Sequence, residues 1–215
     1  MKIIAIDGPS GSGKGTIAKE VAKRLGYTYV DTGAMYRCVS LKSIRENIEP
    51  FEEDKIVDLL KNMDIKMTND WKVYMDGEDV SDAIRATDVT HKVSKISPIP
   101  ALREVMRQKQ IELASNNNIV MEGRDITTEV FPNADYKFYL DASVEVRAKR
   151  RQLQNEEKGI ESNIEDVKKS IEERDYDDMH RPVGALTRTD DQIYIDSSNM
   201  TIEEVINKML EEVGE

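Results

Sequence analysis

Short apolar runs bounded by polar residues recur at five places along the chain and predict buried β-strands. Helical patterns separate these runs, and strands that alternate with helices are typical of a parallel sheet with helices on both faces. The sequence therefore predicts an α/β fold around a five-stranded parallel sheet. The expected strands are Ile3–Asp7, Tyr27–Asp31, Asn118–Glu122, Tyr136–Asp141 and Gln192–Asp196.

The stretch between the second and third strands, residues 32–117, is too long for a simple crossover. It holds helical patterns at Ala34–Asn47, Glu53–Asn62 and Ala101–Ser115, and a strand-like stretch at Asp64–Val80 that turn signals interrupt. We expect an inserted subdomain with a small antiparallel sheet, carried by a discontinuous core of residues 1–31 and 118–215. The polar interruption at 155–163, between two helical patterns, predicts a short lid.

The segment that follows the first strand has the composition of a phosphate-binding loop, or P-loop. It fits G-x-x-x-x-G-K between a strand and a helical pattern, the context in which this signature binds phosphate. Backbone N–H groups of such a loop contact phosphate oxygens, while the helix N-terminus and a lysine add positive charge. The predicted ATP-binding residues are Gly8, Pro9, Ser10, Gly11, Ser12, Gly13, Lys14, Gly15 and Thr16.

One helical stripe changes from apolar to charged along its length. Its spacing of three and four residues places all members on one face of a helix. The charged end either emerges into solvent or enters a cleft, and Arg181-Pro182 favours the cleft because proline fixes the end of the helix. Arginines there would bind phosphate, and the aspartate would hold one of them or bind a sugar hydroxyl. The stripe is Ile164, Val167 and Ile171, all expected in the core, followed by Arg174, Asp178 and Arg181.

Arg147, Arg150 and Arg151 form a second basic set, at i, i+3 and i+4 spacing just before the expected lid. This set is either a solvated basic face or a clamp that closes over a transferred phosphoryl group. The neighbouring P-loop favours the clamp.

Charge and cysteine content restrict the partners and the compartment. The 42 acidic residues outnumber the 31 basic ones, and the net charge of −11 disfavours a nucleic-acid polymer or an anionic membrane as partner. Cys38 is the single cysteine, so no intrachain disulfide can form. The N-terminus opens on a strand rather than a signal peptide, and no long apolar run is present. We expect a cytoplasmic protein that is not bound to a membrane.

Together these motifs resemble the bacterial cytidylate kinase family of nucleoside monophosphate kinases over nearly the whole chain. The P-loop alone indicates only a superfamily, and the segments after the second and third strands are more specific. The segments that carry the resemblance are Ile6–Thr16, Asp31–Arg37, Glu122–Asp125 with Val130–Pro132, Leu140–Ser143, and Glu173–Asp175 leading to Arg181-Pro182.

The resemblance implies phosphoryl transfer from ATP to CMP or dCMP, with Mg²⁺, by a protein with a P-loop NTPase fold. We expect this protein to be a monomer. The resemblance also implies that Thr32, Tyr36, Arg37, Arg124 and Arg181 surround the CMP phosphate, and that Ser94, Arg103 and Asp125 read cytosine. Arg174 and Asp178 would contact the ribose. From their place beside the P-loop, we also expect Arg150 and Arg151 to bind ATP. The residues expected to act in catalysis are Lys14, Arg124, Arg174, Asp178 and Arg181.

The sequence departs from common patterns at two positions. Gly15 follows the P-loop lysine where Ser or Thr is usual, so the hydroxyl expected near Mg²⁺ is that of Thr16. After Gly123-Arg124-Asp125 the family continues with a hydrophobic residue and then Gly-Thr, whereas this chain has Ile126-Thr127-Thr128.

Two other functions fit parts of the pattern. The same scaffold could phosphorylate UMP, AMP or a small metabolite, or it could be a nucleotide-binding switch without catalysis. The chain contains neither N-K-x-D nor D-x-x-G, which disfavours a GTPase-like switch.

Overall fold

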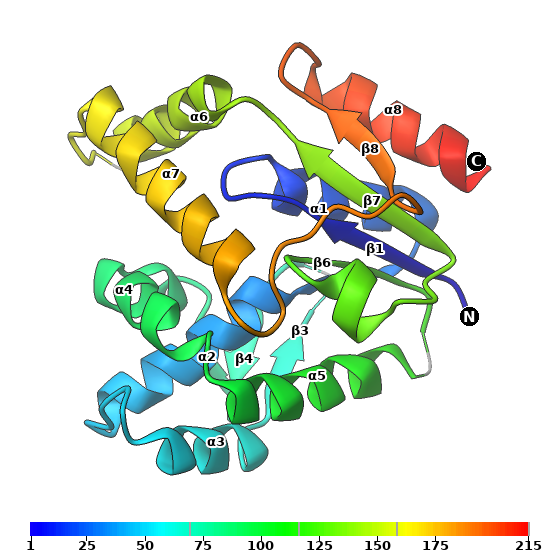
Figure 1. Cartoon of the computed structure of the whole chain (residues 1–215). Helices are drawn as coiled ribbons and strands as arrows, with labels where there is room; N and C mark the ends of the chain where they lie inside the picture. Colours follow the sequence, from blue (N-terminus) through cyan, green and yellow to red (C-terminus); the bar gives the residue numbers. More distant parts are fainter. Residues whose placement is uncertain (69, 116, 158, 215) are drawn as a thin grey trace.

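A five-stranded parallel sheet forms the centre of the molecule in a computed structural model that describes residues 1–68, 70–115, 117–157 and 159–214. Position 158 of the predicted lid lies outside the described residues. The strand order is β2-β6-β1-β7-β8, which confirms the predicted sheet (Figure 1). The strands are β1 (Ile3–Asp7), β2 (Thr28–Asp31), β6 (Ile119–Gly123), β7 (Tyr136–Asp141) and β8 (Ile193–Asp196).

Helices cover both faces of this sheet because alternate residues of each strand point to opposite sides. Ile4 and Ile6 of β1 belong to a core cluster with residues of α1 (Lys14–Leu25) and α8 (Ile202–Val213). Ala5, between them, belongs to a second cluster formed mainly by the segment 32–117. Both faces are therefore buried, which explains why the strands read as continuous apolar runs.

The segment 32–117 contains a three-stranded antiparallel sheet, β3-β4-β5, as expected. Its first helix begins at Thr32, two residues before the predicted start, because the Asp31 carboxylate accepts a hydrogen bond from the Ala34 N–H at 2.9 Å and caps the helix. The elements are α2 (Thr32–Arg45), α3 (Glu53–Lys61), β3 (Ile65–Met67), β4 (Val73–Met75), β5 (Glu78–Asp79), the 3₁₀ turn η1 (Ala83–Arg85), α4 (Thr87–Ile96) and α5 (Pro100–Ala114).

Three elements complete the carboxyl-terminal half: a short π-helix η2 (Ile126–Val130), α6 (Val144–Glu157) and α7 (Ile164–His180). The predicted core stripe of α7 is partly wrong, because Ile171 is buried whereas Ile164 and Val167 are only half-buried. Both lie in the first turn of the helix, where it projects beyond the sheet (Figure 1). Among the described residues, no helix is both long and apolar enough to cross a membrane.

Among the described residues, Phe138 is the largest fully buried side chain, and it lies on β7, next to the central strand β1. We expect Phe138→Ala to lower the free energy of unfolding by about 3–5 kcal/mol, because it leaves a cavity in a closed core. Denaturant unfolding measures this, with Phe51→Ala as the control, since Phe51 is 81% exposed and its truncation should change little. Equal effects of the two substitutions would contradict this account of the core.

Candidate functional site

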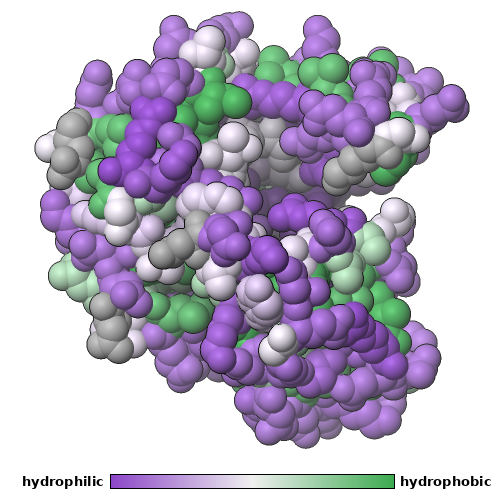
Figure 2. Space-filling view, turned by 180° about the vertical axis from the view of Figure 1, so that it is seen from behind, coloured by the Kyte–Doolittle hydropathy of each residue, from purple (hydrophilic) through white to green (hydrophobic). Residues whose placement is uncertain are grey.

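The carboxyl ends of β1, β2, β6 and β8 open into one cavity of about 560 Å³. Ligands of open α/β sheets bind at this edge. Segments from α4, α5, α6 and α7 close the cavity from the opposite side. Figure 2 shows the molecule hollowed at one edge, with mostly hydrophilic residues along the rim.

The P-loop takes a backbone path that its glycines make accessible. Gly8 has φ +151°, and a Cβ there would lie 2.0 Å from the carbonyl oxygen of Leu140. Gly11 has φ +80°, and a Cβ there would lie 3.2 Å from Cβ of Arg147. Only glycine allows the loop to pack this closely against β7 and α6.

Lys14 stands at the start of α1 with only 5% of its surface exposed. Its Nζ donates hydrogen bonds to the Pro9 carbonyl oxygen at 2.8 Å and to Ser12 Oγ at 3.3 Å. Burial, and next the nearby Arg124 guanidinium, lower the pKa of Lys14, while Glu122 opposes the shift. A negatively charged ligand beside Nζ would raise the pKa of Lys14 again and stabilise the ammonium form. The surroundings of Lys14 thus suit the binding of an anion.

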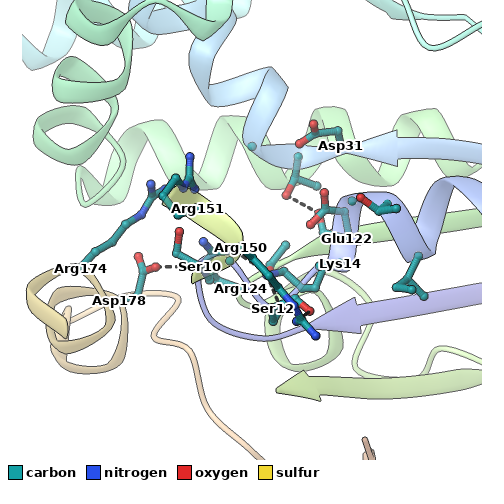
Figure 3. A pocket seen from close by; sticks show the side chains of 18 of the residues that line it. Ser10, Ser12, Lys14, Asp31, Glu122, Arg124, Arg150, Arg151, Arg174 and Asp178 are labelled. Atoms are coloured by element: carbon teal, nitrogen blue, oxygen red, sulfur yellow. Dashed lines mark hydrogen bonds and ion pairs between the residues drawn. The ribbon is translucent and has the colours of Figure 1, made fainter. Parts of the chain in front are cut away.

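Guanidinium groups crowd the part of the cavity that faces α7. Burial, together with the neighbouring Arg124, Arg37 and Arg151 guanidinium groups, lowers the pKa of Arg174 to about 10, while Asp178 opposes the shift. Figure 3 shows Arg151 of α6 and Arg174 of α7 directed toward the same side of the cavity. This excess of positive charge favours a ligand with several negative charges.

Asp178 of α7 binds two arginines that line the cavity, Arg124 and Arg181. It accepts hydrogen bonds from Nε of Arg124 at 2.8 Å and from Nη1 of Arg181 at 3.4 Å. Burial by itself would raise the pKa of the Asp178 carboxyl, but the Arg124 and Arg181 guanidinium groups outweigh it and hold that pKa below its usual value. The carboxylate therefore fixes arginines from two elements in one place.

A third polar group lies between α5 and the end of β6. Arg103 donates a hydrogen bond to Oδ2 of Asp125 and another to the Ser97 carbonyl oxygen at 3.1 Å. Its guanidinium carbon lies 5.6 Å from the centre of the Tyr36 ring. The cavity thus ends in a flat, oriented pair of one carboxylate and one guanidinium, which suits the polar edge of a planar ligand.

The cytidylate kinase family model matches residues 4–215. The chain is 46% identical over 210 residues to cytidylate kinase from Caldanaerobacter subterraneus subsp. tengcongensis, covering 98% of this chain and 93% of that protein. It is 44% identical over 213 residues to the same enzyme from Oceanobacillus iheyensis, with 98% and 93% covered. The chain belongs to the cytidylate kinase family.

Solved structures of more distant proteins share the fold of this cytidylate kinase family member. Shikimate kinase from Bacteroides thetaiotaomicron aligns with a TM-score of 0.52 at 13% identity, covering 100% of this chain and 99% of that one. A gluconokinase from Sinorhizobium meliloti aligns with a TM-score of 0.51 at 16% identity, covering 99% and 91%. At such identities the likeness concerns the P-loop kinase fold alone.

Most of the predicted site residues of this family member line the cavity. Gly8 and Pro9 lie buried behind it, and Ser94 is exposed on α4 outside the lining, one turn before Ser97, which belongs to it. The predicted residues that line the cavity are Ser10, Gly11, Ser12, Gly13, Lys14, Gly15, Thr16, Thr32, Tyr36, Arg37, Arg103, Arg124, Asp125, Arg150, Arg151, Arg174, Asp178 and Arg181.

Arg147 does not belong to the clamp that the sequence suggested. Its side chain is 4% exposed and turns into the protein, where Nε donates to the Ala142 carbonyl oxygen at 2.8 Å. Nη1 donates to the Ser10 carbonyl oxygen at 3.1 Å and to Asp175 Oδ2 at 2.5 Å. Arg147 therefore supports the P-loop from behind, whereas Arg150 and Arg151 reach the cavity.

Several lining residues were not predicted as part of the site. Glu122 begins a segment that carries the family resemblance but was given no role in the site, and Ser97 was given none either. The loop after β8 contributes Ser197, Met200 and Thr201. Its position after the carboxyl end of a strand is a usable signal, because ligands of open α/β sheets bind at that edge.

The donor set near the P-loop fits a Mg²⁺ ion that arrives with a nucleotide. In the described ranges, no group of three or more His, Cys, Asp or Glu residues could hold a metal by itself. Gly15 leaves space beside Glu122, whose Oε1 lies 3.0 Å from where a Cβ of residue 15 would be. One carboxylate with phosphate and water ligands is the coordination that Mg²⁺ commonly takes, and the hydroxyl-bearing Thr16 lines the same cavity.

The ion pair between Arg147 and Asp175 can be tested by unfolding. We expect Arg147→Met to lower the free energy of unfolding by about 3–5 kcal/mol, because it leaves the Asp175 carboxylate buried without its partner. The double variant Arg147→Met with Asp175→Leu should recover part of that loss. Lys149→Met, an exposed position on the same helix, is the control and should be neutral; a loss as large as that of Arg147→Met would contradict the assignment.

Proposed function

We propose that this protein transfers the γ-phosphoryl group of ATP to CMP or dCMP, giving ADP and CDP or dCDP. The observation that carries the proposal is a single cavity with an anion-binding group on each side. One side is the P-loop with Lys14, and the other is the guanidinium cluster around Arg124, Arg174 and Arg181. Two phosphate-bearing ligands can thus meet end to end.

ATP binds at the P-loop side in this proposal. Backbone N–H groups of the loop and the N-terminus of α1 contact its phosphates, and Lys14 Nζ exchanges its bonds to Pro9 and Ser12 for phosphate oxygens. Arg150 and Arg151 approach from α6. When bound, Mg²⁺ supplies positive charge to the phosphates, with Glu122 and Thr16 at its edge of the site.

CMP binds between α2, β6 and α7. Its phosphate lies among Thr32, Tyr36, Arg37, Arg124 and Arg181, and the three arginines line one cavity in spite of their mutual repulsion. Arg174 and Asp178 face the ribose region. Asp178 already bonds two arginines, so a sugar hydroxyl would bind to a carboxylate that is fixed in place.

Asp125 and Arg103 recognise the base. The exocyclic amine of cytosine donates to the Asp125 carboxylate, while Arg103 donates to ring N3 and O2. Uracil has a carbonyl in place of the amine, which would face the carboxylate acceptor to acceptor. Ser94 remains a further predicted contact, which requires α4 to move toward the base.

Catalysis needs no general base, because the CMP phosphate is itself an anionic nucleophile. Its oxygen attacks the γ-phosphorus, and the bond to the β-γ bridging oxygen breaks to release ADP. The protein holds the two phosphates in line and neutralises the charge that spreads over the transferred group, through Lys14, Arg124, Arg174 and Arg181. Closure of the segment 155–163 would exclude water.

We further propose that the protein acts as a monomer in the cytoplasm, on small nucleotides rather than nucleic acid. The net charge of −11 supports this choice of substrate, since a polyanion would be repelled while a nucleotide reaches the local basic cluster.

Removal of the P-loop ammonium should abolish most of the activity. We expect Lys14→Ala to lower kcat by at least about 100-fold with the fold retained, because one preorganised charge on the transferred group is lost. A coupled assay of ADP release, with circular dichroism, measures both quantities. Lys23→Ala on the exposed face of the same helix is the control, and near-normal rates for Lys14→Ala would refute the role of the loop.

A substrate panel tests the base site. With ATP and Mg²⁺, the protein should phosphorylate CMP and dCMP with a kcat/KM at least about tenfold above that for UMP, because a buried acceptor–acceptor contact is costly. Asp125→Asn should reduce this ratio, since an amide can donate to the uracil carbonyl. Preference of the unaltered protein for UMP, AMP or another acceptor would instead favour a different kinase on this scaffold.

A further inference from the structure

Thr127 occupies the position at which the chain departs from the family pattern, and its side chain is fully buried. It lies at the start of η2, directly after Arg124, Asp125 and Ile126. A buried hydroxyl in place of glycine needs hydrogen-bond partners, because an unpaired one costs stability.

The partner that accepts from Thr127 is Asp7, the last residue of β1 and itself fully buried. Thr127 donates from Oγ1 at 2.6 Å and from its N–H at 2.8 Å, both to Oδ2 of Asp7. The N–H of Ile126 donates to Oδ1 of Asp7 at 2.9 Å. One carboxylate thus binds two successive residues of the turn that follows β6.

Gln192 completes the network from the segment that precedes β8. Its Nε2 donates to Thr127 Oγ1, and its Oε1 accepts from the Thr189 N–H at 2.8 Å. The Asp7 carboxylate can only accept and the Gln192 amide nitrogen can only donate, so the Thr127 hydroxyl has one satisfied orientation. Gln192 is 7% exposed, and Asp7 and Thr127 are fully buried, so solvent does not reach this network.

The Arg124 side chain donates a hydrogen bond to Asp178, and the Asp125 side chain accepts one from Arg103. The backbone that follows them is held by Asp7, whose carboxylate accepts hydrogen bonds from the N–H groups of Ile126 and Thr127. The position of the turn between these two sets of bonds therefore determines where the Arg124 and Asp125 side chains can contact a ligand.

We propose that the Thr127 hydroxyl is a positioning group for the nucleoside monophosphate site, holding the turn that carries Arg124 and Asp125 against β1 and against Gln192. It touches neither substrate. This inference rests on the proposed function, since it concerns the CMP side of that site.

Thr127→Val tests the proposal, because valine keeps the shape and the backbone N–H but removes the hydroxyl. We expect KM for CMP to rise on the order of tenfold, as for loss of one buried hydrogen-bonded group, with KM for ATP changed less than about threefold. Thr127→Ser restores the hydroxyl and should return KM for CMP to within about threefold of the original. Ser43→Ala removes another buried hydroxyl, bonded to the Ser40 carbonyl oxygen at 2.8 Å, and is the matched control.

A fall in Tm with an unchanged KM for CMP, as expected for Ser43→Ala, would overturn the proposal, and so would an equal rise of both KM values. If Thr127→Val does not fold, Gln192→Met decides, since it removes the donor to the hydroxyl and leaves Thr127 and Asp7 unchanged. It also removes the bonds of Gln192 to the Thr189 N–H and the Thr187 carbonyl oxygen, neither of which belongs to η2. That variant should raise KM for CMP by a smaller factor, and no rise would overturn the proposal.

Hydrogen exchange of the amides at 124–128 gives a reading that needs no substrate. Exchange should be faster in Thr127→Val than in the unaltered protein or in Ser43→Ala, and unchanged exchange would overturn the positioning role. Absence of CMP phosphorylation by the unaltered protein would instead refute the proposed function and leave the exchange result standing.

Discussion

Repulsion among buried guanidinium groups is the constraint around which this site is built. Arg174 lies close enough to Arg37, Arg124 and Arg151 for all three to lower its pKa. Like charges held together in a region of low dielectric destabilise a fold unless opposite charges lie between them. Asp178 supplies one such charge from α7 and Asp125 another from the end of β6. The repulsion within the cluster lowers the free energy of unfolding, and in the proposed site a phosphate therefore binds to arginines that are already assembled.

Two buried carboxylates connect this cluster to the P-loop. Asp7 ends the strand that leads into the loop, and it also holds the turn behind Arg124. Asp175 lies on α7 beside Arg174, and it holds Arg147, which bonds the Ser10 carbonyl oxygen of the loop. The P-loop and the arginines at the other end of the cavity are therefore held by the same buried carboxylates. A shift of the P-loop would move the arginines opposite it, which suits a reaction that needs two phosphates in line.

Residues with a local or periodic signal could be predicted from the sequence. Strands buried on both faces have continuous apolar sequences, so the sheet could be predicted, and the fixed spacing of the P-loop located this loop at the end of β1. The charged stripe of α7 was placed in the cleft because Arg181-Pro182 ends the helix, and Arg174, Asp178 and Arg181 indeed line the cavity.

Residues whose role depends on a distant partner could not be predicted in this way. Spacing puts Arg147 on the same side of α6 as Arg150 and Arg151, but its partner Asp175 lies 28 residues away and turns it inward. Thr127 belongs to a turn without periodicity, and Asp7 and Gln192 reach it across 120 and 65 residues. Such pairings follow from the topology of the sheet, which composition and spacing do not encode.

Lysine and arginine have different tasks in this cavity. Arginine presents several donors in a rigid plane, so Arg124 can bond the Asp178 carboxylate through Nε while it faces the cavity. Lys14 carries three donors on a flexible stem, and its present acceptors are an oxygen of its own loop and the Ser12 hydroxyl. In the proposed mechanism Lys14 exchanges these acceptors for phosphate oxygens by rotation of its side chain. The guanidinium groups would then define where the acceptor phosphate lies, and the ammonium would follow the phosphoryl group as it moves between the two nucleotides.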